Sequence, residues 1–207
     1  MNVKSIISPN RITFCRIILS FIILFIFFLE NFLNLYFFLI IIWVLIVFNE
    51  ITDIIDGYVA RKYNLVSDVG KILDPYADVL QHLTYFVFFF YKGITPYYFF
   101  VIFIYREISI GVFRNLIIQF NVVQQAKFLG KLKSLFYAIS AFASLFLYSL
   151  DKLKITIFVD NFIISNLSLN LNFSFCVEMI YCASAFLTII SLIDYVFIFL
   201  DLIKYEK

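Results

Sequence analysis

Four aspartates lie close together in a chain that is otherwise mostly apolar, and they are the side chains best suited to chemistry. Clustered carboxylates repel one another, so they need protons or a multivalent cation. An all-oxygen set without histidine or cysteine favours Mg²⁺ or Mn²⁺ over zinc, and four carboxylates are enough to bridge two such ions. Paired hard ions of this kind activate phosphoryl chemistry. The candidate metal ligands are Asp53, Asp56, Asp74 and Asp78.

The spacing of these aspartates predicts two helices that face each other. Asp53 and Asp56 are three residues apart, which places them on one face of an α-helix. Asp74 and Asp78 are four residues apart and share a face in the same way. A short turn between the helices would bring the two faces together. Pro75 leaves two arrangements open: either Asp74 is the N-cap of the second helix, or that helix kinks at the proline.

The composition indicates a polytopic helical membrane protein. Of the 207 residues, 64% are hydrophobic and 14% are charged, whereas about 25% of a soluble domain is charged. The mean hydropathy is +1.00. This length is typical of one domain, so residues 1–207 are expected to form a single membrane domain. A net charge of +2 is too small to indicate a nucleic-acid partner.

Apolar runs predict an all-α fold with six transmembrane helices. The expected spans are 12–29, 34–48 continued as a helix to about Arg61, 75–90, 96–118, 135–150 and 176–203. The expected connections are a turn at 62–68, a basic polar loop at 121–133 and an interfacial loop at 151–175. Six spans put both termini on one side, and most of the 16 Lys and Arg residues fall there. The positive-inside rule then makes the termini and the aspartates cytoplasmic.

The stretch from Asp53 to Asp78 resembles the signature of the CDP-alcohol phosphatidyltransferase family, D-x2-D-G-x2-A-R-x8-G-x3-D-x3-D, at every fixed position. The resemblance implies a metal-dependent enzyme that transfers a phosphatidyl group from CDP-diacylglycerol to an alcohol and releases CMP. It also implies that the four aspartates hold two metal ions and that Asp78 is the general base for the acceptor hydroxyl. By the same resemblance, the residues that contact CDP-diacylglycerol are Gly57, Arg61 and Ser67, with Asn10 and Thr13 on the cytidine side.

Basic residues further along the chain indicate a phosphorylated acceptor. Arg106 and Arg114 are about two helical turns apart and therefore share a face, and Lys131 and Lys133 begin the fifth helix. Arginine can hold a phosphate group through two parallel hydrogen bonds. Two structural interpretations stay open beside this one. The lysines can simply follow the positive-inside rule, and Arg106 can pair with Glu107 or with a motif aspartate.

These segments are similar to the bacterial phosphatidylglycerophosphate synthase branch of the family. The runs R-E-I-S-I-G-V-F-R at 106–114 and G-K-L-K at 130–133 look like its R-E-I-x-I-x-x-x-R and G-K-x-K segments, and 9–16 looks like its P-N-x-x-T-x-x-R start. The resemblance implies sn-glycerol 3-phosphate as acceptor, and a homodimer in the bacterial inner membrane. The residues implied to hold the acceptor phosphate are Arg106, Arg114, Lys131 and Lys133. The branch commonly has a lysine after the last motif aspartate, where this chain has Val79.

Other functions stay open on the sequence alone. Within the family, the acceptor could instead be inositol phosphate, inositol, serine, choline or a phosphatidylglycerol. From a different class, the acidic cluster could bind the ion of a divalent-cation transporter. Against a transporter, the carboxylates gather at one helix end with Arg61 among them, and no acidic path crosses the membrane. His82, the only histidine, is either a proton relay near Asp78 or a polar residue packed beside the site.

Overall fold

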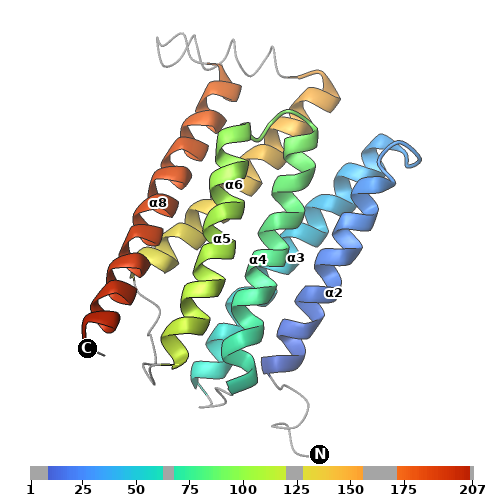
Figure 1. Ribbon diagram of the computed structural model, residues 1–207. Coiled ribbons are helices and arrows are strands. Elements are labelled where there is room, and N and C mark those ends of the chain that lie inside the picture. The colour runs from blue at the N-terminus through green and yellow to red at the C-terminus, as the bar shows by residue number, and fades with distance from the viewer. Residues whose placement is uncertain (1–8, 63–67, 120–127, 156–171, 206–207) are drawn as a thin grey trace, which may run out of the picture. The chain divides into compact units, whose positions relative to one another are not determined.

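The computed structural model describes residues 9–62, 68–119, 128–155 and 172–205, and over these ranges the chain forms helices and turns with no strand (Figure 1). The helices of this described part are α2 (Pro9–Phe28), α3 (Leu35–Lys62), α4 (Asp68–Tyr91), α5 (Tyr97–Gln119), α6 (Phe128–Leu153) and α8 (Phe173–Tyr205). The expected all-α class is therefore confirmed. Of the turn expected at 62–68, Lys62 ends α3 and Asp68 begins α4, while residues 63–67 lie outside the described part. Most of the expected interfacial loop, 156–171, also lies outside it.

Within the described ranges, four helices are long and apolar enough to cross a membrane. These segments are Asn10–Phe28, Leu35–Ile55, Leu132–Leu153 and Phe173–Ile203. They identify the chain as a membrane protein, as its composition indicated. Helices α4 and α5 are of comparable length, 24 and 23 residues, but they carry ionisable side chains such as Asp78 and Arg106 along their length. Six membrane crossings and cytoplasmic termini stay predictions.

The chain forms two compact units, Met1–Phe88 and Phe89–Lys207. In the first unit α2 packs along α3, and Ile23, Ile42 and Ile46 are fully buried there. Helix α4 joins this pair through an aromatic contact near its C-terminal end. The rings of Phe27 and Phe88 are nearly parallel, with their centroids 3.7 Å apart. These apolar contacts fix the register of three helices whose polar residues lie at the opposite end of the unit.

Helix α4 begins at Asp68 and runs through Pro75. Of the two arrangements that Pro75 left open, the one with Asp74 as N-cap is excluded, because six helical residues precede Asp74. The apolar run marked only the lipid-facing part of the helix, and the helix itself extends further. Hydrogen bonds from α2 reach both Asp74 and Asp78, so the proline lies between two anchored residues.

The second unit is built on α8, which packs against both α5 and α6. Its core contains the fully buried rings of Phe99, Tyr137 and Tyr181. Hydroxyl groups also meet across the helices: Ser144 Oγ lies 2.6 Å from Tyr181 Oη, and Thr188 Oγ1 donates to Tyr137 Oη at 3.0 Å. Because lipid supplies no hydrophobic force between helices, small residues and such polar contacts hold the helices together.

Helix α6 starts at Phe128, seven residues before the expected span at 135. The prediction of a loop at 121–133 is therefore wrong for 128–133, and residues 120–127 lie outside the described part. Hydropathy marks the stretch that lies in lipid, whereas the hydrogen-bonded helix continues into polar sequence. As a consequence Lys131 and Lys133 belong to the first turns of a helix.

Candidate active site

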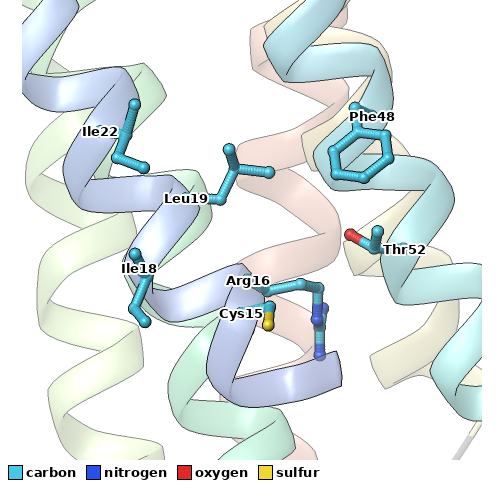
Figure 2. Close-up of a pocket in the computed structure, with 7 residues that line it drawn as sticks. All are labelled: Cys15, Arg16, Ile18, Leu19, Ile22, Phe48 and Thr52. Carbon is cyan, nitrogen blue, oxygen red and sulfur yellow. The ribbon is translucent and has the colours of Figure 1, made fainter. Parts of the chain in front are cut away.

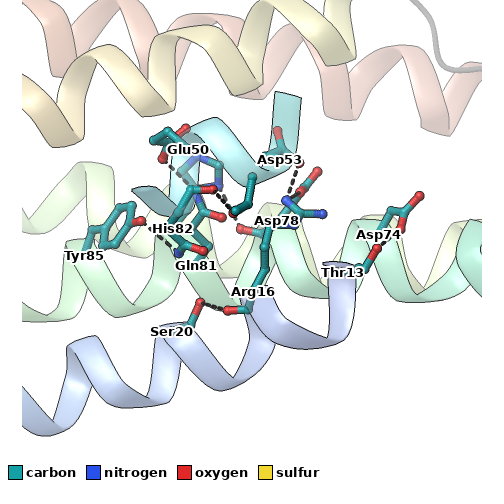
Figure 3. A network of polar contacts seen from close by, with 12 residues as sticks. Thr13, Arg16, Ser20, Glu50, Asp53, Asp74, Asp78, Gln81, His82 and Tyr85 are labelled. Atoms are coloured by element: carbon teal, nitrogen blue, oxygen red, sulfur yellow. Dashed lines mark hydrogen bonds and ion pairs between the residues drawn. The ribbon is translucent and has the colours of Figure 1, made fainter. Parts of the chain in front are cut away.

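A buried arginine connects two of the motif aspartates. Arg16 lies on α2, and its side chain is only 1% exposed. Its Nη1 donates to Asp78 Oδ1 of α4 at 3.0 Å and also contacts Asp53 Oδ1 of α3 (Figure 3). One guanidinium thus brings together carboxylates that are far apart in sequence. A cation buried in this way needs opposite charges beside it, and the two aspartates supply them.

Helix α2 presents a polar stripe toward the aspartates. Thr13, Arg16 and Ser20 recur at helical spacing and are all buried. Thr13 Oγ1 donates to Asp74 Oδ1 at 2.8 Å, and Ser20 Oγ donates to the backbone oxygen of Arg16 at 3.0 Å. Thr13 was expected on the cytidine side of a nucleotide site. The structure shows its hydroxyl bonded to a motif aspartate, and its place on the cytidine side stays a prediction.

A second polar layer lies one turn further along α4. Gln81 Nε2 donates to Glu50 Oε1 of α3 at 2.6 Å, and Asn49 Nδ2 donates to Tyr85 Oη at 3.1 Å. Sequence reasoning missed this layer, although polar residues in apolar helices are a recognisable signal. The layer ties α3 to α4 directly beside Asp53 and Asp78, and it therefore limits how far the two carboxylates can separate.

His82 lies next to the site and contacts the backbone of Asp78. Its Nδ1 is 2.8 Å from the backbone oxygen of Asp78. Since a carbonyl oxygen only accepts, Nδ1 carries the proton of this hydrogen bond. The ring is buried and stacks on Phe86, with centroids 6.3 Å apart. These contacts favour a packed structural histidine over a proton relay.

An apolar groove of about 210 Å³ lies between α2 and α3. Figure 2 shows apolar side chains of both helices along it and the head of Arg16, with Thr52, at one end. Its lining residues are Cys15, Arg16, Ile18, Leu19, Ile22, Phe48 and Thr52. The groove therefore joins an apolar surface to the charged site, as a ligand with an apolar and a charged part requires.

The motif aspartates supply the type of oxygen donor that a hard divalent cation prefers. Asp53 and Asp78 converge on the same arginine nitrogen, and Asp74 lies one helical turn from Asp78. All three are carboxylates, which Mg²⁺ and Mn²⁺ prefer. Among the side chains that the structure describes, no three acidic, histidine or cysteine groups lie close enough together to hold a metal ion. The side chain of Asp56 lies outside this description.

Other residues that the motif predicted for the nucleotide site are only partly described. Gly57 lies on α3 and Asn10 in the first turn of α2, and both are half-buried. The side chain of Arg61 lies outside the described part of the structure, as does Ser67 entirely. Gly70, which the signature also requires, is buried on α4. Their roles stay predictions.

The basic residues predicted to hold an acceptor phosphate belong to the second unit. Arg106 and Lys133 are brought together on the carboxylate of Glu107, with Arg106 Nη1 at 2.9 Å and Lys133 Nζ at 2.7 Å from Glu107 Oε1. Of the alternatives open for Arg106, pairing with Glu107 is therefore observed. Arg114 is half-buried two turns along α5, and the side chain of Lys131 lies outside the described residues.

The fold and these residues define an all-helical membrane protein in which one buried arginine joins carboxylates of two helices, with an apolar groove beside them. A sequence model of the CDP-alcohol phosphatidyltransferase family matches residues 6–167 of the chain. Because this match covers well over half of the 207 residues, the chain belongs to the CDP-alcohol phosphatidyltransferase family. The resemblance drawn from the aspartate spacing is thus confirmed.

Similar bacterial proteins bear one name, CDP-diacylglycerol–glycerol-3-phosphate 3-phosphatidyltransferase. The protein of Treponema pallidum is 35% identical over 106 residues, which are 51% of this chain and 49% of the relative. The Aquifex aeolicus protein is 32% identical over 135 residues, or 64% of this chain and 71% of the relative. The Bacillus subtilis protein is 34% identical over 107 residues, or 52% and 55%. The match thus spans about half of the first and third relatives.

Proposed function

We propose that this protein transfers the phosphatidyl group of CDP-diacylglycerol to sn-glycerol 3-phosphate, which gives phosphatidylglycerophosphate and CMP. The observation that carries this proposal is the complete family signature on α3 and α4, with Asp53 and Asp78 drawn together by Arg16. The names of the relatives support glycerol 3-phosphate as the acceptor. The reaction belongs to phospholipid biosynthesis.

In the proposed mechanism Asp78 accepts the proton of the acceptor hydroxyl. The hydroxyl oxygen then forms a bond to the phosphorus that carries the diacylglycerol group, and the bond from that phosphorus to the oxygen of CMP breaks. Mg²⁺ or Mn²⁺ held by the four motif aspartates would neutralise the diphosphate charge and stabilise the departing CMP. Arg16 holds Asp78 and Asp53 in place, and Thr13 orients Asp74.

The remaining motif residues are proposed to bind the lipid nucleotide. Gly57 allows a close approach to the backbone of α3, and Arg61 pairs with the diphosphate. Ser67 contacts the nucleotide, with Asn10 and Thr13 on its cytidine side. The groove beside Arg16 has the apolar lining that suits an acyl chain. The four residues proposed for the acceptor phosphate are Arg106, Arg114, Lys131 and Lys133.

We place the protein in the bacterial inner membrane with six crossings, cytoplasmic termini and an active site that faces the cytoplasm. The distribution of basic residues supports this orientation. A cytoplasmic interfacial site suits both substrates, because acyl chains stay in lipid while the charged head groups stay in water. A homodimer is the family expectation.

The proposal is tested by CMP release from the purified protein in detergent with CDP-diacylglycerol and either metal, across a panel of acceptors. We expect release that requires glycerol 3-phosphate and a divalent ion. Release with another acceptor, such as inositol phosphate or serine, would keep the family chemistry and identify Val79 as the informative departure from the branch pattern. No release with any acceptor, from folded protein, contradicts the proposal, and ion flux in liposomes would then test the transporter alternative.

Replacement of Arg114 by alanine should weaken binding of the acceptor and leave binding of CDP-diacylglycerol unchanged. Loss of one charged phosphate contact should raise the KM for glycerol 3-phosphate about tenfold, with little change in the KM for CDP-diacylglycerol. Steady-state kinetics with each substrate varied in turn measures both values. Lys152→Ala, at the exposed far end of α6, is the matched control and should change neither. Equal increases in both KM values would show that Arg114 supports the fold rather than the acceptor.

A further inference from the structure

Glu50 and Gln81 form a hydrogen-bonded pair one helical turn away from two of the motif aspartates. Glu50 lies three residues before Asp53 on α3, and Gln81 lies three residues after Asp78 on α4, so each shares a helix face with its aspartate. Gln81 Nε2 donates to Glu50 Oε1 at 2.6 Å (Figure 3). The two helices run in opposite directions. The pair of Glu50 and Gln81 therefore repeats the apposition of Asp53 and Asp78 one turn further along.

This pair lies on the buried side of the motif carboxylates. The side chains of Asp53 and Asp78 are 42% and 37% exposed, whereas Gln81 is only 1% exposed. A second link between the helices follows, in which the fully buried Asn49 donates from Nδ2 to Oη of the fully buried Tyr85 at 3.1 Å. The two motif carboxylates thus stand at the open end of an interface whose inner end carries two hydrogen bonds between α3 and α4.

The chemical types in the pair are matched. An ionised carboxylate only accepts hydrogen bonds, and the amide of Gln81 donates to Glu50 without adding a charge. A carboxylate at position 81 would instead place a second negative charge against Glu50, and an apolar side chain there would remove the donor. Either change should displace α3 from α4 at the turn next to Asp53 and Asp78.

We propose that Glu50 and Gln81, which lie outside the family signature, are positioning residues of the active site. Their hydrogen bond sets the separation of α3 and α4, and hence that of the carboxylates of Asp53 and Asp78. This inference rests on the proposed function and deepens it. A misplacement of about 1 Å near the reacting groups can lower a rate about a hundredfold. One hydrogen bond beside the site can therefore control turnover without touching a substrate.

The test is a charge swap within the pair, made in the purified full-length protein. Gln81→Glu sets two carboxylates against each other and should lower kcat for CMP release about thirtyfold. The KM for glycerol 3-phosphate should stay within about threefold, because the variant touches no acceptor contact. The double variant Glu50→Gln with Gln81→Glu again has one amide and one carboxylate, in exchanged positions. It should return kcat to within about threefold of the parent, a rescue that general damage to the fold would not show.

A second readout does not depend on turnover. Because Mg²⁺ is proposed to bind the motif carboxylates, the Mg²⁺-dependent rise in Tm reports their arrangement. This rise should be smaller in Gln81→Glu than in the parent, and it should return in the double variant. Thr84→Val is the matched control, since Thr84 is also buried on α4 but donates to the backbone oxygen of Leu80 in its own helix. Both kcat and the Mg²⁺-dependent rise should keep their parent values in Thr84→Val.

The outcomes separate this inference from the proposed function. Parent-like kcat in Gln81→Glu, or a double variant no more active than Gln81→Glu, overturns the pairing even in an active enzyme. If Gln81→Glu does not fold, Gln81→Leu decides: kcat about tenfold below the parent supports the inference, and parent-like kcat overturns it. If the parent releases no CMP with any acceptor, the proposed function fails and Tm decides alone. A smaller Mg²⁺-dependent rise that the swap restores then supports the pair, whereas equal rises, or none in the parent, overturn it.

Discussion

Asp78→Asn should reduce CMP release about thousandfold while the protein stays folded and still binds the nucleotide, as expected for removal of a general base. An asparagine amide has the shape of the carboxylate but cannot accept the proton of the acceptor hydroxyl. The asparagine amide retains an oxygen that can accept a hydrogen bond from Arg16. Arg16 also keeps its contact with Asp53. The variant should therefore keep the geometry of the site and lose CMP release.

The measurement is kcat for CMP release, together with binding of CDP by calorimetry and Tm by thermal unfolding in detergent. Asp151→Asn removes an exposed carboxylate near the end of α6 and should have wild-type turnover. Asp78→Glu keeps a base on a longer side chain, so part of the activity should return. Near wild-type turnover in Asp78→Asn would remove Asp78 as the base, and loss of both turnover and CDP binding would indicate damage to the metal site.

The sequence predicted most of the helices because their signals are local. Apolar runs located each membrane helix, and the uninterrupted run into the motif predicted that the second helix continues to about Arg61, close to the observed end at Lys62. Helix starts were less accurate at Asp68 and Phe128, since hydropathy reports the lipid-exposed stretch and not the first hydrogen-bonded turn. The proline rule, applied alone, placed the start of α4 too late.

The partners of the aspartates were harder to predict than the aspartates themselves. Spacing along one helix shows which residues share a face, but the rotation of α2 that turns Arg16 and Thr13 toward α3 and α4 depends on packing of the whole unit. One signal was present: an arginine within an apolar span is costly unless it has a partner or a function. Applied to Arg16, that argument identifies it as a site residue without any structure.

The pairing of Arg106 with Glu107 also could not be predicted from helical spacing alone. Adjacent residues on a helix do not face each other, so pairing with Glu107 was only one of the alternatives that the sequence left open for Arg106. The long side chains nevertheless converge because both turn toward α6 and α8, where Lys133 and Ser191 supply further contacts. Tertiary packing here overrides the direction that helical periodicity alone would assign.

Arg16→Met should lower the Tm of the metal-free protein by roughly 5 °C and increase the stabilisation that Mg²⁺ provides. Methionine fills similar apolar space but removes the cation that Asp53 and Asp78 share. Those two side chains are 42% and 37% exposed, so solvent weakens their repulsion and the loss stays moderate. Without the guanidinium, a divalent ion becomes the main source of compensating charge.

The comparison is a Mg²⁺ titration followed by Tm for the parent, Arg16→Met, Arg16→Lys and the control Arg11→Met, which changes an exposed arginine on the same helix. The Mg²⁺-dependent rise in Tm should be largest in Arg16→Met, smaller in Arg16→Lys because the charge remains, and equal to the parent value in Arg11→Met. Equal Mg²⁺-dependent rises in Tm in all four proteins would show that Arg16 and the metal ion do not share carboxylate ligands. A larger rise in Arg16→Met alone ties the guanidinium and the divalent ion to the same carboxylates, because only shared ligands make the loss of one cation strengthen the effect of the other.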